Sequence, residues 1–165
     1  MNGSKDLKTI IYFKGVYDTL DLFTDHLIEA FESMGYGTFV YHTANEEVSK
    51  KMLLRLLGES QEFAAVTFNN LGYNLSFEQP EAAEGEEGKP EEYNIWDYFH
   101  IPYIDILMDH PFHYEKPLCN MPKTAVILCT DRNHVKIYPA FFTKTSIRQI
   151  SFHMQEWNWD ISINL

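Results

Sequence analysis

Several features common in other protein classes are missing from this 165-residue chain. It has only two cysteines, Cys119 and Cys129, and no Cys-x-x-Cys pair, so we expect no disulfide framework and a reducing, cytoplasmic setting. No apolar run approaches the ~18–20 residues that span a bilayer. The polar start, MNGSKDLK, lacks the apolar segment of a signal peptide. We therefore expect no membrane insertion.

Positive charge is also scarce. The chain has 13 Lys and Arg residues against 24 Asp and Glu residues, which gives a formal net charge of −11. Binding to a phosphate backbone needs clustered Lys and Arg to displace counterions. The composition therefore argues against nucleic acid and against an anionic membrane surface as partners.

The glycine-rich motifs that hold phosphates are absent. The turn after the first expected strand, residues 13–17, has Gly15 but no G-x-G-x-x-G, and the chain has no G-x-x-x-x-G-K-[ST]. A G-x-S-x-G nucleophile motif is missing too. Nicotinamide and ATP enzymes are therefore disfavoured, and we expect no cofactor.

What the chain does contain is a regular alternation of strands and helices. Continuous apolar runs predict buried strands at residues 9–13, 38–41, 63–68, 103–108, 125–129 and 146–152. Helical spacing of apolar residues predicts helices at 18–34, 45–57, 94–99 and 132–142. Such alternation implies parallel strands joined by right-handed crossovers. We predict one α/β domain over residues 1–153: a doubly wound, Rossmann-like parallel sheet of about six strands in three α/β/α layers.

Two of these helices carry specific expectations. Asp18 and Asn45 are predicted to cap the first and second helices. The second helix is expected to bury one face, formed by Val48, Met52, Leu53, Leu56 and Leu57.

Two segments interrupt the pattern. Residues 78–92 contain seven glutamates and one lysine, a net charge of −6, and residues 76–92 are expected to form an acidic, mobile surface loop. A lid or an acidic docking segment is the alternative. The aromatic tail, residues 154–165, is expected to pack back on the domain, with an exposed partner-binding patch as the alternative.

Polar residues follow several of the predicted strands. They are Asn69 and Asn70 after the third strand, Asp109 and His110 after the fourth, and Asp131 after the fifth. In open α/β sheets, ligands bind outside the carboxyl ends of the strands. We therefore expect these side chains to lie around one ligand site.

The densest polar group is Asp109-His110-Pro111-Phe112-His113. A carboxylate beside an imidazole can form a base and its orienting partner. Asp109, His110 and His113 could also ligate zinc or manganese, but their spacing matches no established ligand motif, so no metal site is predicted. A turn fixed by Pro111 with polar flanks is the structural alternative. Asp131 at a helix start is by default an N-cap, and a ligand role is the alternative.

Two long segments, NIWDYFHIPYIDILMDHPFHYEKPL and ILCTDRNHVKIYPAFF, together with VTFNNLG, resemble a bacterial family. It is the N-terminal part of proteins described as spore-maturation-type or glycosyltransferase-like, often known only as a domain of unknown function. The resemblance covers residues 9–152. It lies in Asp-His-Pro after one strand, at Asp109-His110-Pro111, and Asp131 with His134-Val135 after the next.

The resemblance implies the GT-B arrangement, in which two Rossmann-like domains face each other across a cleft. The N-terminal domain receives the acceptor, and no catalytic metal is needed. By position, Asp109 or His110 would be the base that deprotonates an acceptor hydroxyl. Asn69, Asn70 and Asp131 would line the acceptor side.

The sequence departs from that pattern because it ends at Leu165, before a donor-binding domain. The expected function is therefore binding of a glycan or glycoconjugate acceptor, with a separate donor-binding domain or protein as a possible partner. Two alternatives remain open. One is a protein-interaction module that uses the acidic loop and the tail with Trp157 and Trp159. The other is a small hydrolase with a metal on Asp109, His110, His113 and Asp131.

Overall fold

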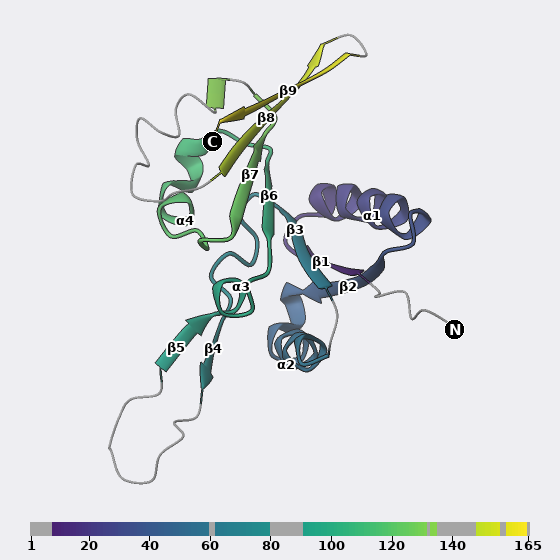
Figure 1. Ribbon diagram of the computed structural model, residues 1–165, viewed down its shortest axis with the longest axis vertical. Helices are drawn as coiled ribbons and strands as arrows, with labels where there is room; N and C mark the ends of the chain where they lie inside the picture. Colours follow the sequence, from purple (N-terminus) through teal and green to yellow (C-terminus); the bar gives the residue numbers. More distant parts are fainter. Residues whose placement is uncertain are drawn as a thin grey trace, which may run out of the picture.

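Strands and helices alternate along the chain in the computed structural model (Figure 1). The structure describes residues 8–59, 62–79, 91–131, 133–134, 148–155 and 158–164. The strands are β1 (Lys8–Lys14), β2 (Gly37–His42), β3 (Glu62–Phe68), β4 (Ser76–Gln79), β5 (Glu91–Asn94), β6 (Tyr103–Leu107), β7 (Ala125–Cys129), β8 (Arg148–Gln155) and β9 (Asn158–Asn164). The helices are α1 (Asp18–Ser33), α2 (Glu46–Leu57), α3 (Ile95–Tyr98) and α4 (Glu115–Cys119), with 3₁₀ turns η1 (Thr43–Asn45) and η2 (Pro111–Tyr114).

The main sheet has the strand order β2-β1-β3-β6-β7-β8-β9. The five strands from the β2 edge to β7 are all parallel. β8 continues the sheet in parallel with β7, and β9 closes it antiparallel to β8. The chain moves from β1 to β2 on one side, then returns to place β3 on the other side of β1. The predicted Rossmann-like α/β fold is confirmed.

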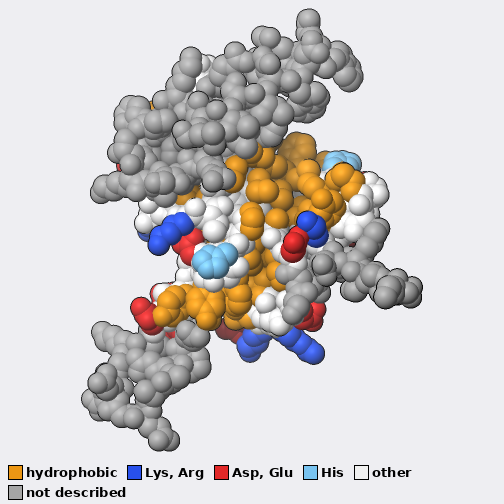
Figure 2. Space-filling view, in the orientation of Figure 1, with side chains coloured by type: hydrophobic (Ala, Val, Ile, Leu, Met, Phe, Trp, Pro, Cys, Tyr) orange, Lys and Arg blue, Asp and Glu red, His pale blue; other side chains and the backbone are white. Residues whose placement is uncertain are grey.

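Helices cover both faces of this sheet (Figure 1). On one face, α1 packs Leu27, Ile28 and Phe31 against the side chains of β1 and β3. On the other face, α2, α3 and α4 cover a larger core around Ile11, which includes Leu53, Trp96 and Leu118. Figure 2 shows hydrophobic side chains gathered across the middle of the molecule, with charged side chains scattered around them. Among the described residues, no helix has the length and apolar character needed to cross a membrane.

Two expectations about helices were wrong. The buried face of α2 is Ser49, Leu53 and Leu57, whereas Val48 and Met52 are 59% and 57% exposed. The buried residues are spaced by four, and Ser49 Oγ is buried because it bonds the backbone of His42. Neither Asp18 nor Asn45 caps a helix through its side chain. Asp18 is the first residue of α1, and Asn45 occupies the N-cap position of α2 without a side-chain hydrogen bond.

The expectation of a single acidic loop was wrong at both of its ends. Residues 76–92 were predicted as one loop, but β4 and β5 occupy its two ends and pair as an antiparallel hairpin. Phe77 and Tyr93 face each other across this hairpin and pack on Tyr98. These aromatic contacts order the ends of the acidic segment. Residues 80–90, and all of the expected helix at 132–142 except residues 133–134, lie outside the described part of the chain.

A turn-rich segment, residues 69–75, connects β3 to the hairpin. Four side chains donate hydrogen bonds to its backbone carbonyls: Thr67 and Tyr103 to Leu71 O, Trp96 to Gly72 O, and Asn94 to Tyr73 O. Gly72 has a φ of +75°, and a Cβ there would lie 2.3 Å from the Phe13 ring. The segment is therefore held firmly against the core.

We predict that Gly72→Ala destabilises the fold by about 3 kcal/mol, because it adds a clash with Phe13 to the strain of a left-handed backbone. Urea unfolding monitored by fluorescence measures this loss. Gly35→Ala is the matched control, since Gly35 also has a positive φ but a Cβ added there would meet no atom within 4 Å. An equal loss in both variants would contradict the close contact with Phe13.

Candidate functional site

The strand order reverses between β1 and β3, which makes the carboxyl ends of these strands the expected place for a ligand. The turn after β1 contributes Val16 and Tyr17, which are 42% and 61% exposed. The turn after β3 contributes Asn69 and Asn70, both with positive φ. From the sequence, site residues were expected after β3, β6 and β7 but none after β1, because strand order cannot be read from strand positions alone.

The start of α1 does not offer a phosphate site. The Gly15 N–H donates to both carboxylate oxygens of Asp21, each at 3.0 Å. Asp18 adds a second negative charge in the first turn. A phosphate at this helix end would meet two carboxylates instead of free N–H groups. This geometry agrees with the absence of a glycine-rich phosphate motif.

Asn69, Asp109 and Tyr114 form a hydrogen-bonded group, which we call the rim network. Asn69 Nδ2 and the Tyr114 hydroxyl donate to Asp109 Oδ2 at 2.8 and 2.9 Å. Asn69 Oδ1 accepts from the Met108 N–H at 2.9 Å. None of the described residues donates to Asp109 Oδ1. The carboxylate is thus fixed in place through Oδ2, while Oδ1 accepts no bond from the described part of the chain.

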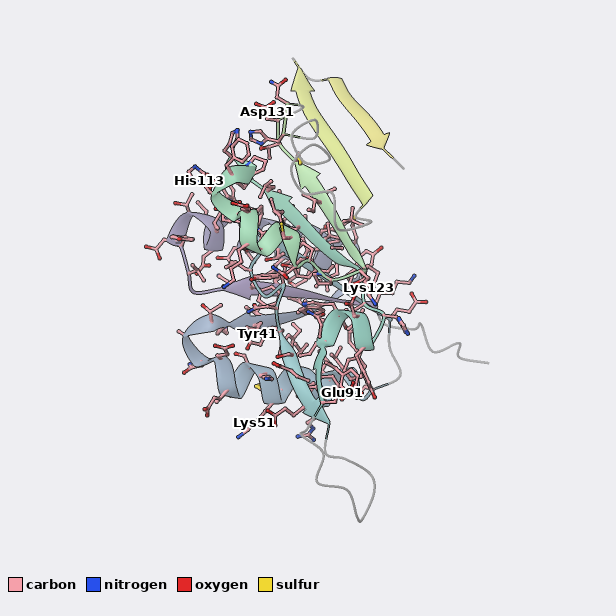
Figure 3. The ribbon with its side chains drawn as sticks, turned by 90° about the vertical axis from the view of Figure 1, so that its left-hand side faces the viewer. Tyr41, Lys51, Glu91, His113, Lys123 and Asp131 are labelled. Atoms are coloured by element: carbon pink, nitrogen blue, oxygen red, sulfur yellow. The ribbon has the colours of Figure 1, made fainter. Side chains whose placement is uncertain are left out.

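A second polar group lies beside the rim network, over the ends of β6 and β7. The rings of His110 and His134 meet edge to face with centroids 4.9 Å apart, and Phe112 lies 5.0 Å from His110. Asp131 Oδ1 accepts from the Asn133 N–H at 2.7 Å, so it acts as a local cap. Figure 3 shows Asp131 and His113 at one edge of the molecule and Lys123, which precedes β7, on the opposite side.

The two histidines differ in their surroundings. His110 Nδ1 accepts the Phe112 N–H at 3.3 Å, so the neutral ring carries its hydrogen on Nε2 and presents a donor. Burial lowers the pKa of His134, an effect that His110 reinforces and Asp131 opposes. His134 is therefore neutral at pH 7. This geometry favours His110 as a hydrogen-bond donor over its expected role as a base.

The structure brings some of the expected site residues together and separates others. Asn69 and Asp109 are in direct contact, and Asp109-His110 and Asp131 share the same edge of the sheet. Asn70 is only 4% exposed, and its side chain is buried beneath the rim. His113 is exposed and contributes its backbone N–H to the 3₁₀ turn. The roles predicted for these residues remain predictions.

Asp105, in the middle of β6, was not among the residues expected at the site. It is fully buried, and its Oδ1 accepts the Asn70 N–H at 2.8 Å. Burial raises the pKa of Asp105 to about 7, while the bond from Asn70 lowers it by less. The sequence did carry a signal for this buried carboxyl. Asp105 lies on the same face of an otherwise apolar strand as Tyr103 and Leu107.

Tyr17 and Tyr114 were also missed, since tyrosines in turns carry little signal by themselves. Burial raises the pKa of Tyr114 well above its usual value, and its bond to Asp109 adds to this effect. Tyr114 therefore stays protonated and donates to Asp109. Tyr17 lies close enough to Tyr114 to contribute to the same shift of that pKa.

A metal centre finds no support among these side chains. In the described ranges, no three His, Cys, Asp or Glu residues are placed to hold one ion. Both cysteines are free, and burial raises the pKa of Cys129 to about 12, which leaves an inert thiol. The hydrolase alternative therefore has no ligand set in the described part of the chain.

Comparison with known proteins does not place the chain in a family. No family model, no curated protein and no solved structure matches it. Its function must therefore be inferred from the site itself.

We predict that Asp105→Asn removes a pH-dependent cost from the fold. Asp105 ionises near 3.8 when unfolded and at about 7 when folded, so the wild type loses stability as the pH rises between these values. Well below pH 3.8 the carboxyl is protonated in both states, and well above pH 7 it is ionised in both and the loss is complete. The stability gap between Asp105→Asn and wild type should widen over this window by up to roughly 4 kcal/mol.

Urea unfolding at half-unit steps from pH 4 to pH 8 measures this gap. Asp97→Asn is the control, because Asp97 is only partly buried but also accepts a backbone N–H, from Lys123. A gap that stays constant for Asp105→Asn, or that widens equally for Asp97→Asn, would show that Asp105 is not the group responsible.

Asn69 provides a separate prediction about the rim network. Asn69→Ala should cost about 2–3 kcal/mol, because it removes the bonds to Met108 and Asp109 and leaves alanine at a φ of 49°. Asn69→Gly loses the same bonds but accepts this backbone, so it should be more stable than the alanine variant by about 1 kcal/mol. Thermal unfolding of both variants separates strain from hydrogen bonding; equal stabilities would exclude the strain.

Proposed function

We propose that this chain binds a glycan or glycoconjugate acceptor at the carboxyl ends of β1, β3 and β6. The observation that carries the proposal is the rim network beside exposed aromatic side chains: its carboxylate is fixed through Oδ2, and its Oδ1 has no partner among the described residues. Tyr17 and Phe112 are 61% and 54% exposed. Binding sites commonly combine apolar and aromatic walls with a few fixed polar groups.

The residue types suit a sugar. A pyranose has hydroxyl groups around its edge and apolar C–H groups on its faces. Asp109 Oδ1 can accept a bond from a hydroxyl, and His110 Nε2 can donate one. The rings of Tyr17 and Phe112 offer apolar faces with amphipathic character. An anionic ligand is disfavoured, because Asp21 and Asp109 both lie at this edge.

The proposal extends to the role implied by the family resemblance. In this interpretation the chain is the acceptor-side domain of a spore-maturation-type, GT-B-like bacterial glycosyltransferase, and Asp109 is the base for an acceptor hydroxyl. The blocked start of α1 supports donor binding elsewhere, on a separate domain or protein. The two free cysteines support the expected cytoplasmic location.

The proposal predicts retention of the protein on an array of neutral, amino and acidic mono- and oligosaccharides. Neutral or acetamido sugars should give the strongest signal. Asp109→Ala and Tyr17→Ala should each weaken binding to the retained sugars at least about tenfold, which corresponds to about 1.4 kcal/mol. Isothermal titration with the best sugar of the array measures the change.

Met52→Ala is the matched control, since Met52 is equally exposed but lies on α2, away from the strand ends. It should bind like the wild type. The proposal would be overturned if both Asp109→Ala and Tyr17→Ala bind like the wild type, or if the array retains no wild-type protein.

A further inference from the structure

The buried carboxyl of Asp105 has a direct link to the proposed site. Asp105 lies between Thr67 of β3 and Ile127 of β7 in the parallel register. Its Oδ1 accepts the Asn70 N–H, whereas its Oδ2 is buried without a partner among the described residues. A buried carboxyl with one unsatisfied oxygen is costly. Packing alone does not explain why an aspartate occupies this position.

The residue that Asp105 holds belongs to a strained turn. Asn69 and Asn70 have φ values of 49° and 65°, a region that side-chain-bearing residues seldom adopt. The Asn70 amide is also buried with both polar atoms unpartnered in the described structure. Strain and unsatisfied polar groups persist where surrounding contacts enforce them, and they cluster at functional sites.

The turn is held at two points. From below, Asp105 fixes the backbone of Asn70. From the side, Asn69 bonds Met108 and Asp109 through its side chain. Because the two asparagines are adjacent, a shift at Asn70 moves Asn69, and Asn69 determines where Asp109 points.

We propose that Asp105 is a positioning residue for the rim network, and that the gain or loss of its proton is transmitted through Asn70 and Asn69 to Asp109. The inference rests on the proposed function, since it describes regulation of that same site. An ionised carboxylate accepts a shorter and stronger bond from an N–H than a neutral carboxyl does. Ionisation of Asp105 therefore holds the turn, and with it Asn69, more firmly.

The groups that face Asp105 do not titrate in the same range. Tyr103 of β6, Tyr114 of η2 and Cys129 of β7 are electrostatically coupled to Asp105. Burial raises the pKa of all three, that of Cys129 to about 12. They stay neutral between pH 5 and pH 9, so Asp105 is the member of this group that changes charge near neutral pH.

The test is a pH titration of the full-length chain by NMR, from pH 5.5 to pH 8.5. The Asn70 and Met108 amides and the Asn69 side-chain amide should shift with one shared midpoint near 7. This midpoint should vanish in Asp105→Asn and persist in Asp97→Asn, the partly buried control. If Asn70 shifts while Asn69 and Met108 do not, the proton is felt locally and the proposal is overturned.

A carbon-detected titration of the Asp105 carboxyl in the wild type keeps the test independent of any variant's folding. Its midpoint should coincide with that of Met108, and a mismatch would contradict transmission. The sugar array, repeated at pH 6 and pH 8, should show roughly fivefold tighter binding at pH 8 for the wild type but not for Asp105→Asn. An empty array at both pH values counts against the proposed function, and the NMR midpoints decide the role of Asp105.

Discussion

The reversal of strand order between β1 and β3 is the constraint on which the rest of this structure depends. The connection from β1 leaves over the face covered by α1, and the connection from β3 leaves over the opposite face. Two turns therefore diverge at the carboxyl ends of neighbouring strands. Their side chains, Tyr17 on one turn and Asn69 on the other, border the same edge. The rim network stands at this edge because Asp109 reaches across from β6 to Asn69.

Much of the fold could be predicted from local sequence, because buried parallel strands produce continuous apolar runs. Strands β1, β3, β6 and β7 agree closely with their predicted ranges. Which face of α2 is buried could not be predicted, because a polar residue, Ser49, lies on that face. Its hydroxyl is satisfied there by hydrogen bonds with the backbone of His42. The hairpin β4–β5 escaped notice because its aromatic partners, Tyr98 and Phe99, lie beyond the acidic segment.

The candidate site was only partly within reach of sequence reasoning. Asn69 and Asp109 were identified from their places after strands, but their contact joins residues 40 positions apart and depends on β3 lying next to β6. Asp105 was not identified, because it lies inside a strand and not after one. Its full burial and its bond to Asn70 depend on how β3 and β6 pair. Side-chain roles such as that of His110 Nδ1 likewise depend on a turn geometry that the sequence does not specify.

The anchoring of residues 69–75 has a consequence for where insertions and deletions can be tolerated. Four side chains bond the carbonyls of this segment and so hold it to the core: Thr67, Asn94, Trp96 and Tyr103. The span between Gln79 and Glu91 joins the chain beyond these ties. Insertions and deletions in that span can therefore accumulate without displacing Asn69. Homologues should differ freely in length there while the spacing from Thr67 to Leu75 stays constant.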